Sequence, residues 1–237
     1  MPTGGFETFG GPHLVVLAIT FALPILLASI ARRTASAALA DGLGYALAGI
    51  LLVNEVTHWG IRLAELGVRG FVQNHLPLQV CGVATLLTAA VLVVRNQKMY
   101  EIAYFWGLVG TSNAVITPSV EAGFPDYRFF QYFTAHSGIV VGVLYATLGL
   151  RMRPTLAGLW RAFIAVNVFA VAVGAINVAL DSNYMFLCEP PPDTASPFFF
   201  APWPWYIPII DAIALALFFA VLSPFLVSGW SAARRAA

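Results

Sequence analysis

The chain of 237 residues is 59% hydrophobic and only 10% charged, whereas a soluble globular domain carries about 25% charged residues. This number of charged residues is too small to cover a water-facing surface of this size. The composition therefore predicts an all-α, polytopic membrane protein. A net charge of +1 argues against a nucleic-acid-binding protein, and the two cysteines, Cys81 and Cys188, exclude a secreted disulfide scaffold.

Seven apolar stretches approach or exceed the roughly 20 helical residues that cross the hydrocarbon core. The first ends at Arg32-Arg33, the third begins at Pro77, which suits a first helical turn, and Pro118 closes the fourth. The second and fourth are the most polar, and a six-helix arrangement stays open if one of them is re-entrant. The predicted helices form a single transmembrane domain over residues 1–237, at 12–31, 40–66, 77–95, 99–117, 127–150, 156–180 and 204–227.

The distribution of Lys and Arg predicts the orientation, because basic residues gather on the cytoplasmic side. With seven spans, one side receives nine basic residues and the other receives three, and the 181–203 loop on the second side has no basic residue. The N-terminus is therefore expected outside and the C-terminus inside, as a multi-pass protein of the cell membrane. No basic segment precedes the first apolar run, so we expect no cleaved signal peptide.

Polar residues gather in the predicted outer halves of the helices. Ionisable groups within a membrane span are costly, so they usually face the interior of a bundle and often mark function. Independent structural polar residues should be scattered over both halves, and this clustering instead favours a site. The residues concerned are Glu55, His58, Cys81, Asn113, Gln131, His136, Asn177, Asp181 and Tyr184.

Cys81 and His136 are the candidate catalytic residues. A histidine beside a thiol activates it as a nucleophile, and the pair can hold an acyl group as a thioester. Asn113 or Asn177 could supply an oxyanion hole. Structural roles also remain open, because a lone buried cysteine behaves as a small hydrophobe, asparagines join helices, and Asp181 could simply end a helix.

Three other interpretations remain open. Glu55-x-x-His58 resembles the motif of di-iron bundles, but those need two such motifs, so a metal-dependent hydrolase is only an alternative. A non-catalytic lipid-binding or transporter-like protein is the second alternative. A disulfide between Cys81 and Cys188 would remove the nucleophile. We expect membrane lipids as partners and no cofactor.

Several motifs resemble those of the YwaF-type integral membrane proteins of bacteria, in order along nearly the whole chain. The resemblance implies a relation to a eukaryotic ether-phospholipid acyltransferase branch and, more distantly, to multipass lipid hydrolases that use a Thr and a His. It implies Cys81 and His136 as the functional pair, with Gln79 where many relatives carry histidine. The motifs are Leu76-Pro-Leu-Gln-Val-Cys81, Tyr104-Phe-Trp-Gly107, Thr117-Pro118, Phe129-Phe-Gln-Tyr-Phe-Thr-Ala-His136, Asn183-Tyr-Met-Phe-Leu-Cys188 and Pro202-Trp-Pro-Trp-Tyr206.

The sequence therefore predicts a lipid acyltransferase or acyl hydrolase near the outer leaflet, with Cys81 as nucleophile and His136 as base. The residues expected to bind the substrate are Glu55, His58, Gln79, Asn113, Gln131, Asn177, Asp181 and Tyr184.

Overall fold

The computed structural model of the chain describes residues 5–120, 122–191 and 199–236, so part of the 181–203 loop lies outside the described residues. Over these ranges the secondary structure is helical, apart from one isolated bridge between Gly5 and Ala122. The helices are α1 (Gly11–Thr34), α2 (Ala37–Asn74), α3 (Val80–Val94), α4 (Gln97–Phe105), the π-helical η1 (Trp106–Thr111), α5 (Ser112–Ile116), α6 (Tyr127–Leu148), α7 (Leu156–Leu180), the 3-10 turn η2 (Tyr184–Phe186) and α8 (Tyr206–Ala236).

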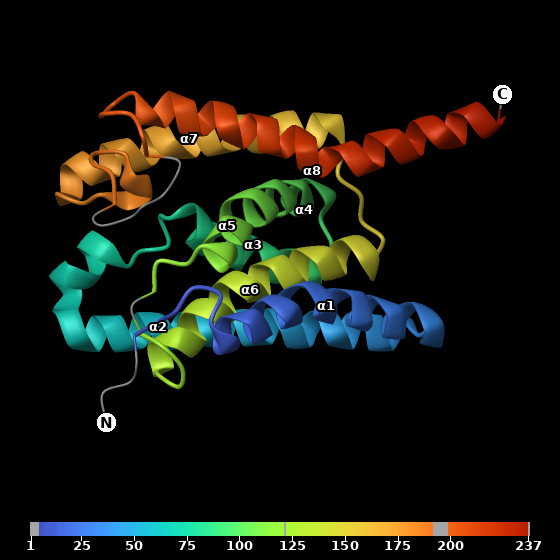
Figure 1. Ribbon diagram of the computed structural model, residues 1–237, viewed down its shortest axis with the longest axis horizontal. Coiled ribbons are helices and arrows are strands. Elements are labelled where there is room, and N and C mark those ends of the chain that lie inside the picture. The colour runs from blue at the N-terminus through green and yellow to red at the C-terminus, as the bar shows by residue number, and fades with distance from the viewer. Residues whose placement is uncertain (1–4, 121, 192–198, 237) are drawn as a thin grey trace.

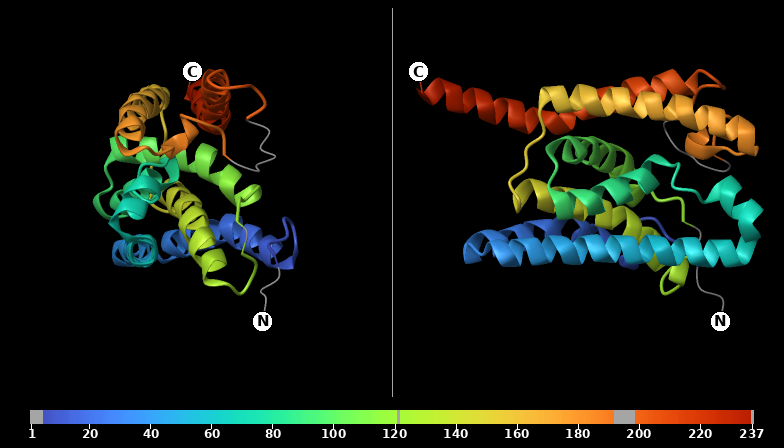
Figure 2. Two further views of the ribbon diagram at one scale, coloured as in Figure 1. Left: turned by 90° about the vertical axis from the view of Figure 1, so that its left-hand side faces the viewer. Right: turned by 180° about the vertical axis from the view of Figure 1, so that it is seen from behind.

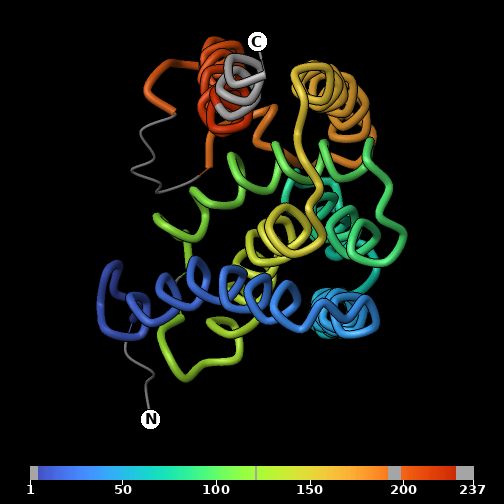
Figure 3. Tube along the Cα trace, turned by 90° about the vertical axis from the view of Figure 1, so that its right-hand side faces the viewer, coloured from blue at the N-terminus to red at the C-terminus, as the bar shows by residue number. Residues whose placement is uncertain are grey.

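The helices lie roughly parallel to one long axis and alternate in direction (Figure 1). Because α4, η1 and α5 continue one another, the described residues form seven helical rods. In Figures 1 and 2, α7 and α8 form one layer, α3 to α5 the next, and α1 and α2 the third, with α6 between the last two. Viewed along the axis, α6 lies in the middle of the bundle (Figure 3).

Four of these helices are long and apolar enough to cross a membrane: α1, α2, α7 and the Tyr206–Val227 part of α8. The 15-residue α3 is a shorter apolar helix. Most of the four helices' apolar surface faces outward, as it should where lipid replaces water as the surrounding solvent. The protein is therefore a multi-pass membrane protein.

Two glycines let α6 pack closely against its neighbours. A Cβ at Gly138 would lie 2.7 Å from Leu51 Cδ2, and a Cβ at Gly142 would lie 2.6 Å from Thr88 Cγ2. The two are four residues apart, which is the small-residue spacing that lets membrane helices approach each other. Close packing of α6 on α2 and α3 places the first turns of α3 beside the middle of α6.

Helix α1 agrees closely with the predicted helix at 12–31. Helix α2 runs past the predicted end at residue 66, but Gly67 has a φ of 66°, which breaks the helical path there. A positive φ is easy only for glycine, so the bend falls where the sequence supplies one. Beyond it, the end of α2 turns across the bundle (Figure 1).

Helix α3 begins at Val80, three residues later than the predicted start at Pro77. Residues 76–79 are kept out of the helix by contacts with η2. The Tyr184 hydroxyl accepts the N–H of Leu76 at 2.9 Å and donates to the Val72 carbonyl at 2.8 Å. The Gln79 side-chain oxygen accepts the N–H of Met185 at 2.9 Å.

The predicted helix at 99–117 is present but interrupted. Its middle, η1, is π-helical from Trp106 to Thr111. A π-helical turn carries an extra residue per turn and often occurs at functional sites. Thr111, the last residue of this turn, contacts Cys81 on α3.

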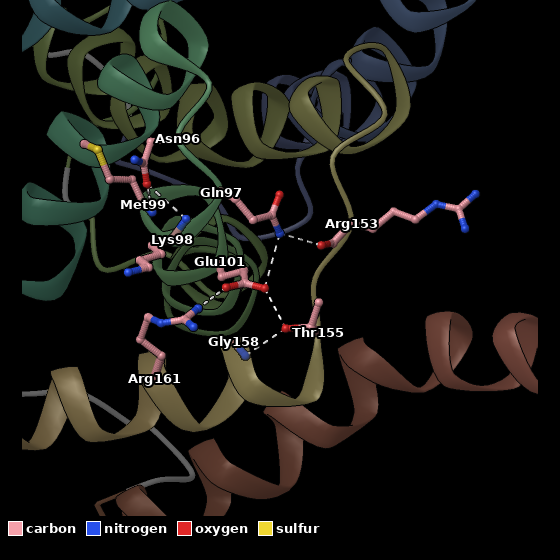
Figure 4. A network of polar contacts seen from close by, with 9 residues as sticks. All are labelled: Asn96, Gln97, Lys98, Met99, Glu101, Arg153, Thr155, Gly158 and Arg161. Carbon is pink, nitrogen blue, oxygen red and sulfur yellow. Dashed lines mark hydrogen bonds and ion pairs between the residues drawn. The ribbon is translucent and has the colours of Figure 1, made fainter.

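A buried polar network joins α4 to α7 at the end of the bundle where the basic loops lie (Figure 4). The Glu101 carboxylate forms an ion pair with Arg161 and accepts hydrogen bonds from Thr155 Oγ1 at 2.7 Å and Gln97 Nε2 at 3.2 Å. Thr155 also caps α7 by accepting the N–H of Gly158 at 2.9 Å. The network fixes α7 against the rest of the bundle.

Candidate functional site

Cys81 lies in the first turn of α3, at the end of the bundle opposite the basic loops. Backbone N–H groups in a first helical turn lack partners within the helix, and the helix dipole there favours negative charge. The start at Val80 therefore places the sulfur nearer to the helix terminus than the predicted start at Pro77 would. A thiolate at this position is stabilised by the helix itself.

His136 lies on α6 with one ring nitrogen already occupied. Its Nδ1 is 2.8 Å from the carbonyl oxygen of Tyr132, and the two rings stack with their centroids 4.1 Å apart. Because a carbonyl oxygen can only accept, Nδ1 carries the proton of the neutral ring. Nε2 then presents a lone pair and can act as a base.

The side chains of Cys81 and His136 lie close enough to interact with each other. With Nδ1 bonded to Tyr132, Nε2 is the ring nitrogen that is left to exchange a proton with the thiol. On another side the Thr111 hydroxyl, which is fully buried, donates to Cys81 Sγ at 3.8 Å. The sulfur is thus fixed by one group that can take its proton and by one that can hydrogen-bond to the thiolate.

Glu55 is the third ionisable group near the pair. It is buried on α2, its carboxylate is hydrogen-bonded to the Trp59 side chain, and it interacts electrostatically with His136. A carboxylate beside an imidazole stabilises the imidazolium that forms when the ring takes a proton. Helices α2, α3, α6 and η1 together build this centre.

A cavity of about 340 Å³ opens beside Cys81, between the α7–α8 layer and the start of α3. Most of its lining is aliphatic or aromatic, and its polar lining residues include Gln79, Asn167, Tyr206 and Asp211. Largely apolar clefts with a few convergent polar groups are the usual form of small-molecule sites. The sulfur therefore faces His136 on one side and an apolar cavity on another.

Other residues expected at the site lie apart from this cavity. The His58 ring contacts the His75 ring, with centroids 5.5 Å apart, and it does not line the cavity. Asn113 lies on α5, where its side-chain oxygen accepts from Thr117 Oγ1 at 3.3 Å. The backbone carbonyl of Gln131 accepts from the Asn54 side chain at 3.3 Å.

Asn177 and Tyr184 hold the chain together after α7. The Asn177 side chain donates to the Tyr184 carbonyl at 2.9 Å and accepts the Tyr184 N–H at 2.8 Å, and both residues are buried. Burial raises the pKa of the Tyr184 hydroxyl, which therefore stays protonated in its two bonds at Val72 and Leu76. Asp181 is exposed and ends α7 in a left-handed conformation. These contacts position η2, and with it Met185, Phe186 and Leu187, along the cavity wall.

The metal and disulfide alternatives receive no support from the geometry. Among the described residues, no three His, Cys, Asp or Glu side chains are grouped to hold a metal ion. The rings of His58 and His75 lie 5.5 Å apart, and burial and the neighbouring Arg62 lower the pKa of His75. Cys81 and Cys188 are both free, and Cys188 is exposed.

Sequence reasoning missed three residues at this site: Thr111, Tyr132 and Asp211. Thr111 reaches the sulfur from the π-helical η1, and helical periodicity gives no sign of a π-helical turn. Tyr132 could have been found, because it lies one helical turn before His136 and its ring and carbonyl face the imidazole. Asp211 is an acidic residue within an apolar span, which is itself a signal of function.

Comparison with known proteins finds a family relation. A family model described as the TMEM164 family matches residues 8–222, which include every residue of the centre and of the cavity lining. No curated protein matches the chain, and no solved structure does. The more detailed resemblance to YwaF-type proteins stays a prediction.

Proposed function

The chain belongs to the TMEM164 family, and we propose that it is a membrane enzyme that moves acyl chains of phospholipids through a thioester on Cys81. The observation that carries this proposal is that Cys81, at the edge of an apolar cavity, interacts with His136. The orientation of His136 by Tyr132 adds to it, since only Nε2 is left to take the thiol proton.

The first step of the proposed reaction forms the acyl-enzyme. The thiol proton moves to His136 Nε2 as Sγ attacks the carbonyl carbon of a lipid ester, and the C–O bond to the glycerol oxygen breaks. His136 then gives its proton to that oxygen, which leaves as an alcohol. Backbone N–H groups of the first turn of α3 are placed to stabilise the developing oxyanion.

The second step releases the acyl chain. The oxygen of water or of a lipid hydroxyl attacks the thioester carbonyl while its proton moves to His136 Nε2. The C–S bond breaks, and Sγ takes the proton back from His136. Water as the acceptor gives a free fatty acid, and a lipid hydroxyl gives a new ester. Glu55 would stabilise the imidazolium in both steps.

The lining of the cavity supports an acyl chain as the group held beside the sulfur. Trp106, Phe186, Ile210 and Phe218 contribute apolar surface, and a CH₂ group buried there gains about 0.8 kcal/mol. A chain that extends along α8 from the sulfur would leave its ester group at the start of α3. That is where the nucleophile and the N–H groups of the first turn lie.

The direct test is to trap the acyl-enzyme. Purified protein in phospholipid nanodiscs is expected to carry an acyl mass on the Cys81 peptide after acid quenching, and neutral hydroxylamine is expected to remove that mass. Cys188 serves as the internal control, because it is exposed and lies outside the cavity. Bound lipid with no acyl mass on Cys81, under conditions in which lipids are turned over, would rule out the thioester. Bound lipid without any turnover would favour the lipid-binding alternative.

We also propose seven membrane crossings with the N-terminus outside. Two observations support this arrangement. The seven rods alternate in direction, and the ends of α1, α3 and α6, where Arg32, Arg95 and Arg151 stand in or next to the last turn, lie at the same end of the bundle (Figure 1). Cys188, after α7 at the other end, is then expected to react with a membrane-impermeant maleimide in intact cells. A Cys188→Ser variant supplies the background. Labelling of Cys188 only after the cells are opened would reverse the orientation.

A further inference from the structure

Asp211 is the acidic residue among the described residues that line the cavity. It lies on α8 five residues after Tyr206, which places it about 7.5 Å along the helix at 1.5 Å per residue. No Lys or Arg is among the described lining residues. A carboxylate thus faces the same apolar cavity as Cys81, without a basic partner in its wall.

The hydrogen bonds of Asp211 leave one of its carboxylate oxygens able to accept further hydrogen bonds. Asn167 on α7 donates to Asp211 Oδ1 at 3.1 Å and to the Phe163 carbonyl at 3.0 Å. Both N–H groups of its side-chain amide are therefore used. In the described part of the chain, Asp211 Oδ2 accepts no hydrogen bond from a protein group. A carboxylate can accept about four hydrogen bonds, so the half-buried Asp211 side chain has acceptor capacity left for a ligand in the cavity.

From this arrangement we propose that Asp211, held by Asn167, binds the free hydroxyl of a glycerolipid that enters the cavity beside Cys81. The proposal rests on the proposed function, for which it names the acyl acceptor as a hydroxyl-bearing lipid. Asp211 is a binding residue in this proposal, and the proton transfers stay with His136.

The depth of Asp211 favours a hydroxyl over a charged headgroup. An ammonium headgroup lies at the membrane surface and would lose its hydration on moving several ångströms into an apolar cavity, which is expensive. The glycerol hydroxyl lies below the headgroup, at the level of the ester bonds. It supplies one hydrogen-bond donor, which matches the acceptor that Asp211 Oδ2 leaves open.

The test measures binding in full-length Cys81→Ala protein, so that no lipid is consumed. The probes are 1-oleoyl-lysophosphatidylcholine, its 2-deoxy analogue, and 1-oleoyl-lysophosphatidylethanolamine, each competing with a tritiated lipid on protein in detergent. We expect the hydroxyl probe to bind about tenfold more tightly than the deoxy probe, as for a hydrogen bond to a charged group. Asp211→Asn should shrink that ratio, and Asp211→Leu should bring it to about one.

Glu65→Gln is the matched control, because Glu65 is an exposed acidic residue on α2 that pairs with Arg62 and lies outside the cavity. It should leave the tenfold ratio unchanged. A ratio that stays tenfold in both Asp211 variants overturns the proposal. So does a preference of the starting protein for the ethanolamine probe that Asp211→Leu abolishes, because it would assign Asp211 to an ammonium group.

The two proposals fail in different ways. Absence of an acyl group on Cys81 in the wild-type protein would remove the thioester mechanism, and the hydroxyl-to-deoxy ratio would still stand. Acylation of Cys81 together with equal binding of both probes to every variant would remove the acceptor site alone.

Discussion

Replacing Cys81 with alanine is expected to reduce acyl release and acyl transfer by the purified protein to background, a loss of about 10³-fold or more. The thioester cannot form without the sulfur, and no other thiol or imidazole is among the described residues that line the cavity. Replacing His136 with glutamine should lower turnover by about 10²- to 10⁴-fold, the usual contribution of a general base. The measurement is release of a radiolabelled fatty acid from phosphatidylcholine in nanodiscs.

The double variant Cys81→Ala/His136→Gln separates catalysis from packing. Residues that act as one unit are strongly non-additive, so the double variant should be no slower than Cys81→Ala alone. Cys188→Ala is the control and should keep full activity. Substantial activity in Cys81→Ala protein would show that another group attacks the ester, and Thr111 would then be the next residue to replace.

Replacing Arg161 with methionine is expected to lower the free energy of unfolding by about 3 kcal/mol. The Glu101 side chain is only 3% exposed, and the variant would leave its charge with the neutral donors Thr155 and Gln97 alone. Glu101→Gln should cost less, because the Arg161 side chain is 36% exposed and water can reach it when its partner is gone. The network is shown in Figure 4.

Thermal unfolding of the purified variants in detergent would rank these effects. Arg62→Met is the control, since it removes an exposed ion pair with Glu65 and should cost no more than about 1 kcal/mol. The expected order of destabilisation is Arg161→Met, then Glu101→Gln, then Arg62→Met. A cost for Arg161→Met no larger than that for Arg62→Met would show that the Glu101 network does not anchor α7.

The helices were largely predictable because each one corresponds to a continuous apolar run of its own residues. The run of residues 156–180 is apolar enough to be helical in lipid whatever it packs against, and its bounds agree with α7. The start of α3 was predicted wrongly, because Pro77 suits a first helical turn but the helix begins at Val80. Tyr184 and Met185, about a hundred residues further along, keep that segment out of the helix.

The site was predictable in part for the same reason. Cys81, His136 and Glu55 stood out because ionisable or reactive groups are rare in apolar spans, and the structure brings these three together. Asn177 and Tyr184 stood out by the same rule, but their hydrogen bonds join η2 to α7 and α2. Polarity within a span signals a partner, and the sequence does not say whether that partner is a ligand or a neighbouring helix.

The sequence alone therefore determined that this protein crosses a membrane several times and that its reactive residues gather toward one end of the helices. Hydropathy and charge act on each segment separately, which is why they can be read without a structure. Only the tertiary structure decided which of these residues meet. Cys81 meets His136 where α3 packs near α6, Thr111 reaches the sulfur from the π-helical η1, and Asp211 lines the same cavity from α8. Those are contacts between helices far apart in the chain, and the spacing of residues within one helix does not encode them.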